Sequence, residues 1–257
     1  MKRAVLWLAA VLAGMLLAVL TCLPAAWFGP IVESQTAGRL TLGDAQGTLW
    51  RGSAFIGGAP GANGAVTQLL PGRFAWRLSP LVLFGQVALD LANPQAFSQE
   101  VHVDGSWSQW QVSPAELLLP ATGLAGLGAP LNTLAPSGTL RLSWTMLELL
   151  RQGNMVSVNG RTVLSMSDMG SRMSSVKPLG SYQLVMDWRG TQAQLALTTV
   201  RGALLLSGSG ALDNGRLRFA GQAAAADGYE ETLGNMLNLL GQRRLVGGKN
   251  IIALEFK

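Results

Sequence analysis

The sequence predicts a mainly β protein, in which a single N-terminal transmembrane helix precedes a curved, mostly antiparallel β-sheet domain. Residues 4–32 contain no Asp, Glu, Lys or Arg, whereas later segments alternate apolar and polar residues with the period of a half-buried strand. The chain also has 32 Gly among 257 residues and only 13% charged residues, which suits a sheet with many turns. We expect the sheet to be partly closed or folded into two layers, with one C-terminal amphipathic helix.

The first predicted element is the apolar run at residues 4–23, which follows Lys2 and Arg3. A helix needs about 20 apolar residues to cross a hydrocarbon core of roughly 30 Å, and this run supplies them. Its length exceeds the roughly 7–15 residues of a cleavable signal peptide, which favours a retained signal anchor, although the small residues Ala25 and Ala26 keep cleavage open. By the positive-inside rule, residues 1–3 form a cytoplasmic tip and residues 24–257 an exported β-rich domain, which in a Gram-negative cell would lie in the periplasm.

Alternating segments and tight turns define the predicted sheet. Residues 182–188 place Tyr, Leu, Met and Trp on one face and mainly polar residues on the other. The triplet 213–215, Asp-Asn-Gly, is a hairpin signal because Asn and Gly tolerate the positive φ angles of tight turns. Other such segments lie at residues 74–78, 87–91, 101–103 and 140–144. Their short connections favour antiparallel meanders.

Few helices are expected in the domain. Residues 227–241 form the clearest one, with Leu233, Met236, Leu237 and Leu240 on one face. Residues 113–116, Ser-Pro-Ala-Glu, have the pattern of a helix N-terminus, so we expect a single helical turn that ends at Pro120. Residues 146–152 are compatible with either a short helix or a strand. Residues 250–256 alternate and should return to the sheet.

The segment at residues 120–136 is the best candidate for a long crossing loop or an internal boundary. It is rich in Gly, Ala, Pro and Leu, and residues 122–136 carry no charge. The sequence thus predicts one domain at residues 24–257 with a candidate division at 120–136.

We find no catalytic, cofactor or metal site in the sequence. The single histidine, His102, lies on the polar side of a predicted strand, where a surface histidine is the simpler interpretation. A metal site needs a cluster of His, Cys and carboxylates, and one His with one Cys, Cys22, does not supply it. The net charge of +5 is too scattered for a nucleic-acid-binding face. We therefore expect no enzymatic activity, no cofactor and no nucleic-acid partner.

The eight tryptophans divide into two groups. Trp76, Trp144 and Trp188 are in phase with apolar neighbours, which indicates core positions. Trp107 and Trp110 are close together in a predicted strand region and could form exposed contact aromatics. For these two, a binding role and a structural role both remain open.

Several short motifs resemble one known family. The first is the run 47–52, Gly47, Thr48, Leu49, Trp50, Arg51 and Gly52, and it is followed by Trp-Arg-Leu-Ser-Pro at 76–80 and Gly-Ser-Gly-Ala-Leu at 208–212. With the anchor and the late helix, their order resembles protein N of the bacterial type II secretion system. The anchor and the Gly-punctuated strands are more distantly similar to AsmA-like envelope proteins.

The resemblance implies a non-catalytic inner-membrane subunit that contributes to export of folded proteins from the periplasm across the outer membrane. Its partners would be other inner-membrane and periplasmic subunits of the secretion apparatus, contacted through protein surfaces such as sheet edges. The AsmA-like similarity implies an alternative, a lipid-binding or lipid-transfer protein whose curved sheet shields acyl chains. Neither resemblance brings catalytic residues.

Overall fold

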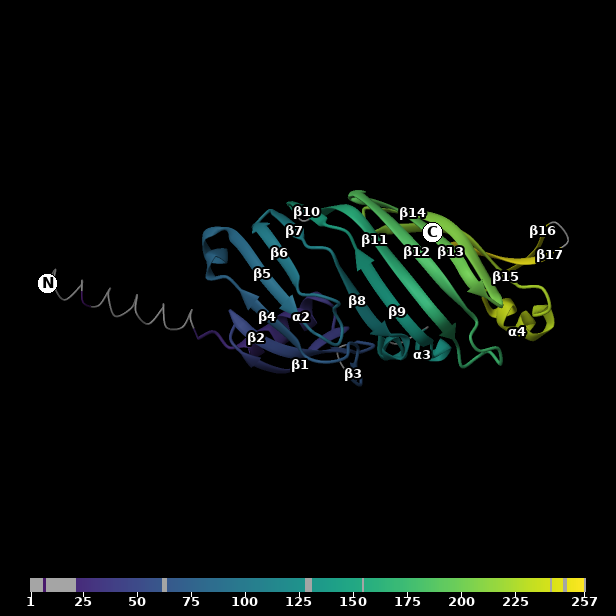
Figure 1. Cartoon of the computed structure of the whole chain (residues 1–257), viewed down its shortest axis with the longest axis horizontal. Helices are drawn as coiled ribbons and strands as arrows, with labels where there is room; N and C mark the ends of the chain where they lie inside the picture. The colour runs from purple at the N-terminus through teal and green to yellow at the C-terminus, as the bar shows by residue number, and fades with distance from the viewer. Residues whose placement is uncertain are drawn as a thin grey trace.

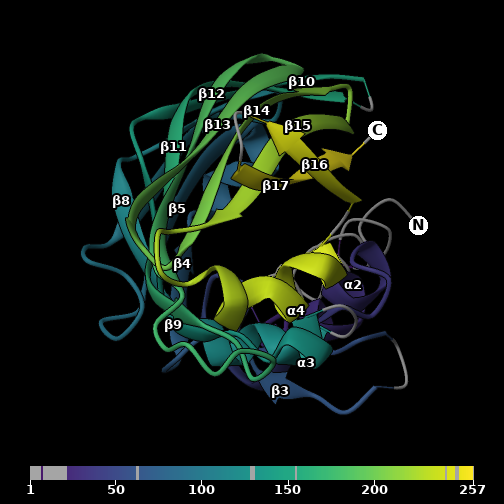
Figure 2. The same cartoon turned by 90° about the vertical axis from the view of Figure 1, so that its right-hand side faces the viewer.

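The protein folds around one large β-sheet that bends into an open trough (Figures 1 and 2). The computed structural model describes residues 7, 22–61, 64–127, 131–153, 155–240, 242–246 and 249–256. Every strand pairing within this part of the chain is antiparallel. The mainly β, antiparallel prediction is confirmed. The sheet is single and open, so the expectation of a partly closed or two-layered arrangement is wrong.

The N-terminal third of the sheet is a meander. Its strands are β1 (Leu40–Gly47), β2 (Arg51–Gly58), β4 (Phe74–Leu78), β5 (Gln86–Ala92) and β6 (Val101–Ser106), each paired with the next. A two-residue strand, β3 (Thr67–Gln68), pairs with the end of β2. Among the described strands, β1 pairs with β2 alone and forms one edge of the sheet.

The middle of the sheet is built from interrupted strands. The short strands β7 (Gln109–Val112) and β8 (Ala115–Pro120) follow each other in the chain, and so do β9 (Ser137–Trp144) and β10 (Leu147–Gln152). Across the sheet, β7 pairs with β10 and β8 pairs with β9. Both β9 and β10 pair with the 16-residue strand β11 (Met155–Gly170). The predicted helical turn at residues 113–116 is therefore wrong, and residues 147–152 are a strand. Ala115, Leu117 and Leu119 instead lie on one face of β8, opposite apolar residues of β9. Their packing across the two strands outweighs the local helix-start signal.

The C-terminal third continues the meander through β12 (Gly180–Gly190), β13 (Gln192–Gly202), β14 (Leu204–Asp213) and β15 (Arg216–Ala225). The predicted hairpin turn is confirmed: Asn214 and Gly215 have φ angles of 48° and 80°. After α4 (Glu230–Leu240), β17 (Lys249–Phe256) pairs with β15, and β16 (Gln242–Val246) pairs with β17 at the outer edge. The late helix and the returning strand are both confirmed, although Gly241 lies outside the described residues.

Short helices lie on the concave side of the sheet (Figure 2). They are η1 (Ala25–Trp27), α2 (Phe28–Gln35), η3 (Ala121–Leu127), α3 (Leu131–Leu134) and α4. Leu233 and Leu237 of α4 pack on Leu204, Ala223 and Ile252 to form a buried cluster at the C-terminal end. A second cluster, Leu70, Phe74 and Ala96, lies near the N-terminal end. The segment with η3 and α3 joins β8 to β9, which pair with each other.

The predicted anchor at residues 4–23 lies outside the described residues, except for Trp7, Cys22 and Leu23. Among the residues that the structure does describe, no helix has both the length and the apolar character needed to cross a bilayer.

Candidate interaction surfaces

The concave face of the sheet carries a continuous band of apolar side chains, here called the apolar trough. Because side chains alternate along a strand, one register row passes straight across five strands. This row consists of Leu117, Leu142, Leu164, Leu184 and Leu197. Each of these side chains is only half-buried. The row is therefore a partly accessible apolar surface, although Leu140 and Tyr182 on the same face are buried, as are the two clusters described above.

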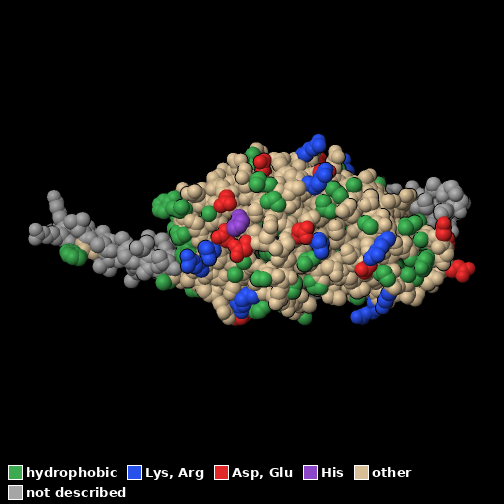
Figure 3. All heavy atoms as spheres, in the orientation of Figure 1, with side chains coloured by type: hydrophobic (Ala, Val, Ile, Leu, Met, Phe, Trp, Pro, Cys, Tyr) green, Lys and Arg blue, Asp and Glu red, His purple; other side chains and the backbone are tan. Residues whose placement is uncertain are grey.

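The convex face is polar and carries cross-strand ion pairs between neighbouring strands. Arg161 Nε lies 2.5 Å from Asp187 Oδ1, and Arg141 Nη1 lies 3.4 Å from Glu116 Oε2. Charged side chains of both signs are dispersed over this face rather than gathered by sign (Figure 3). All four side chains are at least 40% exposed, so each pair contributes little stability. This face offers directional polar contacts to a partner.

The histidine belongs to the same polar face. His102 Nδ1 lies 2.7 Å from Asp90 Oδ1 on the neighbouring strand, and this hydrogen bond, with the Asp90 charge, raises the pKa of His102. Correspondingly, the hydrogen bond from Arg161 lowers the pKa of Asp187. No described side chain other than Asp90 bonds to the His102 ring, and the described residues contain no group of three His, Cys, Asp or Glu that could hold a metal.

The motif at residues 47–52 forms a joint between the chain entering from residue 22 and the sheet. Leu49 donates its backbone N–H to Leu23 O (2.8 Å), and Pro24 bridges to Thr48. Trp76 Nε1 donates to Leu49 O (3.1 Å). The indole ring of Trp76 lies over Gly52, where a Cβ would come within 2.4 Å of it. The two glycines are therefore required by geometry: Gly52 makes room for Trp76, and Gly47 has a φ of 85°.

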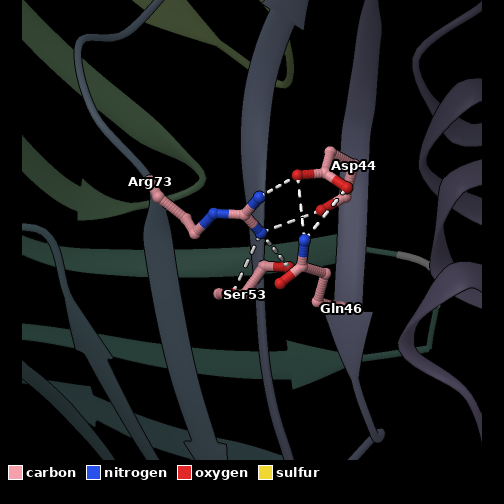
Figure 4. A network of polar contacts seen from close by, with 4 residues as sticks. All are labelled: Asp44, Gln46, Ser53 and Arg73. Atoms are coloured by element: carbon pink, nitrogen blue, oxygen red, sulfur yellow. Dashed lines mark hydrogen bonds and ion pairs between the residues drawn. The ribbon is translucent and has the colours of Figure 1, made fainter.

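A polar network fixes β1 beside this joint. Arg73 pairs with the Asp44 carboxylate and also donates to Asp44 O (2.9 Å) and Ser53 Oγ (3.1 Å) (Figure 4). Gln46 Nε2 donates to both carboxylate oxygens of Asp44. Asp44 itself has a φ of 48° at an irregularity in the β1–β2 register. The network thus holds a bulge in the edge strand, a feature that discourages indiscriminate edge pairing.

An open cavity of about 410 Å³ adjoins the same motif. Its lining includes Arg51, Arg77, Trp76, Asp90 and Glu100. Arg51 and Arg77 face each other across β2 and β4. This mixture of charges suits an exposed polar contact.

The structure separates the two candidate contact tryptophans. Trp107 is exposed in the turn between β6 and β7, whereas Trp110 is half-buried and pairs with Leu149 on the trough side. Trp107 Nε1 donates to Val82 O at 2.5 Å. Trp76, Trp144 and Trp188 lie on the trough side in phase with apolar neighbours, half-buried rather than enclosed.

Sequence reasoning did not find the trough as a continuous surface or the His102–Asp90 pair. Both depend on the register between strands, which alternation within one strand does not reveal. The exposed segment η2 (Pro80–Phe84), Pro-Leu-Val-Leu-Phe, was also missed, although an apolar run between two strands was a visible signal.

Comparison with known proteins identifies one family. The chain matches the family model described as type II secretion system (T2SS), protein N, over residues 38–250. No curated protein and no solved structure gives a significant match. The matched region contains the joint at residues 47–52, the whole trough and α4. The chain therefore belongs to the type II secretion system protein N family.

Proposed function

We propose that this protein is a non-catalytic subunit of the type II secretion machinery, held in the inner membrane by residues 4–23. Its sheet would lie in the periplasm and contribute to export of folded proteins across the outer membrane. The observation that carries this proposal is the family match over residues 38–250. The charge-free run that follows Lys2 and Arg3 supports the membrane placement.

Its action would be to contact other inner-membrane and periplasmic subunits. The polar convex face offers dispersed charges and hydrogen-bonding groups. The edge strand β16 offers backbone groups of the kind that accept a partner strand, whereas the bulge in β1 limits pairing at the other edge. These surfaces require no chemistry at a reacting centre, so the proposed function is assembly.

The experiment is deletion of the gene with complementation by the full-length protein. We expect secreted proteins to accumulate in the periplasm of the deletion strain, or the levels of other inner-membrane subunits to fall. Complementation should reverse either change. Unchanged secretion and unchanged subunit levels would contradict the proposal.

A second candidate function, lipid binding of the AsmA-like kind, is favoured by the half-exposed apolar trough. Its lining offers no hydrogen-bonding side chains along the row from Leu117 to Leu197. The strand backbones there are already bonded to one another, so an acyl chain, which has no polar group to satisfy, fits this lining. The two functions are compatible if bound lipid assists assembly.

Native mass spectrometry of the full-length protein tests the lipid hypothesis with a matched pair on β12. Leu184 points into the trough, and its neighbour Gln183 points to the convex face. We expect phospholipid adducts on the wild type and on Gln183→Glu, and their loss in Leu184→Glu. Equal adducts on all three proteins, or none on the wild type, would contradict lipid binding in the trough.

A further inference from the structure

An apolar tip projects from the N-terminal end of the sheet. It consists of η2, between β4 and β5, and Trp107 in the β6–β7 turn. Phe84 is 85% exposed and Trp107 59% exposed, and Leu81 and Leu83 are also exposed. Figure 3 shows hydrophobic side chains gathered where β4 and β5 connect. Large exposed apolar side chains gathered at one place usually mark a contact surface.

The two parts of the tip are held together as one surface. Gln86 at the start of β5 pairs with Ser106 at the end of β6, so the two connections leave the sheet side by side. Trp107 Nε1 then donates to Val82 O at 2.5 Å. Gly85, with a φ of 92°, ends η2 and turns the chain back into β5. Neither residues 80–84 nor residues 106–109 contain a charged residue.

The tip lies at the end of the sheet where the chain arrives from the predicted anchor. Leu23 is bonded to Leu49, and Trp50 O accepts from Leu78 N, two residues before η2 begins. Three connections therefore lie at the same end of the strands: the β1–β2 turn, η2 and the β6–β7 turn. Figure 1 shows the β4–β5 connection at one end of the sheet.

We propose that this tip inserts into the periplasmic surface of the same bilayer that holds residues 4–23. The joint ties the end of the anchor to the strand ends that carry the tip, so a bilayer around residues 4–23 lies beside it. The tip carries no charge that would have to be buried, and Phe and Leu gain free energy on leaving water. Trp favours the membrane–water interface. The inference rests on the membrane anchoring in the proposed function, but not on the role in secretion.

This contact would give the sheet a second attachment to the membrane. One helix alone leaves a domain free to rotate about the membrane normal and to tilt. A second contact through η2 and Trp107 fixes the tilt, so that the N-terminal end of the trough meets the bilayer and the convex face keeps a constant orientation toward partner subunits.

A fluorescence experiment on the full-length protein tests the contact. The protein is reconstituted into vesicles of phosphatidylethanolamine and phosphatidylglycerol whose acyl chains carry a nitroxide, which quenches a nearby NBD fluorophore. Three labelled proteins are compared: the wild type labelled at its single cysteine, Cys22, and the double variants Cys22→Ser/Phe84→Cys and Cys22→Ser/Val200→Cys. Val200 is a matched control, because it is an apolar residue, 67% exposed, near the opposite strand end of β13.

We expect loss of fluorescence at Cys22 and at Phe84→Cys, and none at Val200→Cys. Quenching at Cys22 without quenching at Phe84→Cys would overturn the inference and leave the anchoring intact. No quenching at Cys22 would overturn the anchoring itself. Circular dichroism of each variant checks that the β fold is retained, which is expected because both substituted side chains are exposed.

Discussion

At the scale of single residues, the polar groups of this protein serve to hold strands in register. The His102–Asp90 and Arg161–Asp187 pairs both join adjacent strands on the convex face. Tyr182, in contrast to these exposed pairs, is buried. Burial raises the pKa of Tyr182 to about 12, and its hydroxyl donates to Leu204 O (3.0 Å). The pKa shifts of His102, Asp187 and Tyr182 are thus explained by local structure.

The His102–Asp90 pair predicts a pH dependence. Because the folded-state pKa of His102 is raised, the pair stabilises the fold fully below the ordinary histidine pKa of about 6.5, and this contribution is lost as the pH rises through the raised value. NMR of the only histidine should give a lower pKa in Asp90→Asn than in the wild type. An equal pKa in both proteins would show that the hydrogen bond is not maintained in solution.

The Arg73 network predicts a local effect on the edge strand. In Arg73→Met the bonds to Asp44 and Ser53 are lost, and we expect a cost of about 1 kcal/mol, typical of a hydrogen bond. Hydrogen exchange should become several-fold faster at β1 amides and stay unchanged in β13. Arg77→Met is the control, since none of the described residues bonds to the Arg77 side chain. Equal exchange in β1 of Arg73→Met and Arg77→Met would contradict the role of the network.

At the scale of elements, α4 is a helix docked on the sheet by its apolar face. Leu233 and Leu237 project from one face, as their spacing predicts, and both are buried against β14, β15 and β17. The helix thereby covers part of the C-terminal end of the trough. In the chain it lies within the connection between β15 and β16.

Substitution of Leu237 tests this packing. Leu237→Asp would place an unpaired carboxylate in the apolar cluster, and we expect the free energy of unfolding to fall by about 3 kcal/mol or more. The exposed neighbour Asn235 on the same helix provides the control, and Asn235→Asp should be nearly neutral. Similar thermal stability of Leu237→Asp and Asn235→Asp would show that α4 is not docked.

Some helices and strands could be predicted from the sequence and others could not. The helix near Leu237 and the hairpin at Asn214-Gly215 were predicted because their signals are local: an apolar face within one helix, and a turn that needs positive φ angles. The strand at Ala115–Pro120 was missed because Ser113-Pro114 imitates a helix start, while the strand owes its stability to pairing with Leu140 and Leu142, far away in sequence.

The candidate surfaces show the same contrast between local signals and contacts between distant segments. The motif at residues 47–52 was found from sequence, but its physical role as a joint depends on Trp76 and Leu23. The trough required the register of five strands, and the apolar tip required the proximity of two turns. Such features arise from pairing between distant segments, which alternation along one strand does not encode.

At the scale of the whole molecule, the sheet has two faces of different chemistry that extend over its full length. A sheet packed on one side normally buries its apolar face under helices or a second sheet. Here the row of leucines from Leu117 to Leu197 remains partly exposed. Under the proposed functions, the trough would contact lipid and the polar convex face would contact protein.

Photo-crosslinking in cells tests this separation with neighbouring residues of β13. Leu195 points into the trough and Gln194 to the convex face, so a benzoylphenylalanine at each position samples one face from almost the same place. At Leu195 we expect lipid adducts, with little change in mobility on a gel. At Gln194 we expect no lipid adduct, and protein adducts wherever a secretion subunit covers this part of the convex face. Protein adducts from Leu195 would contradict the division, because the mainly apolar trough would then be covered by a polypeptide.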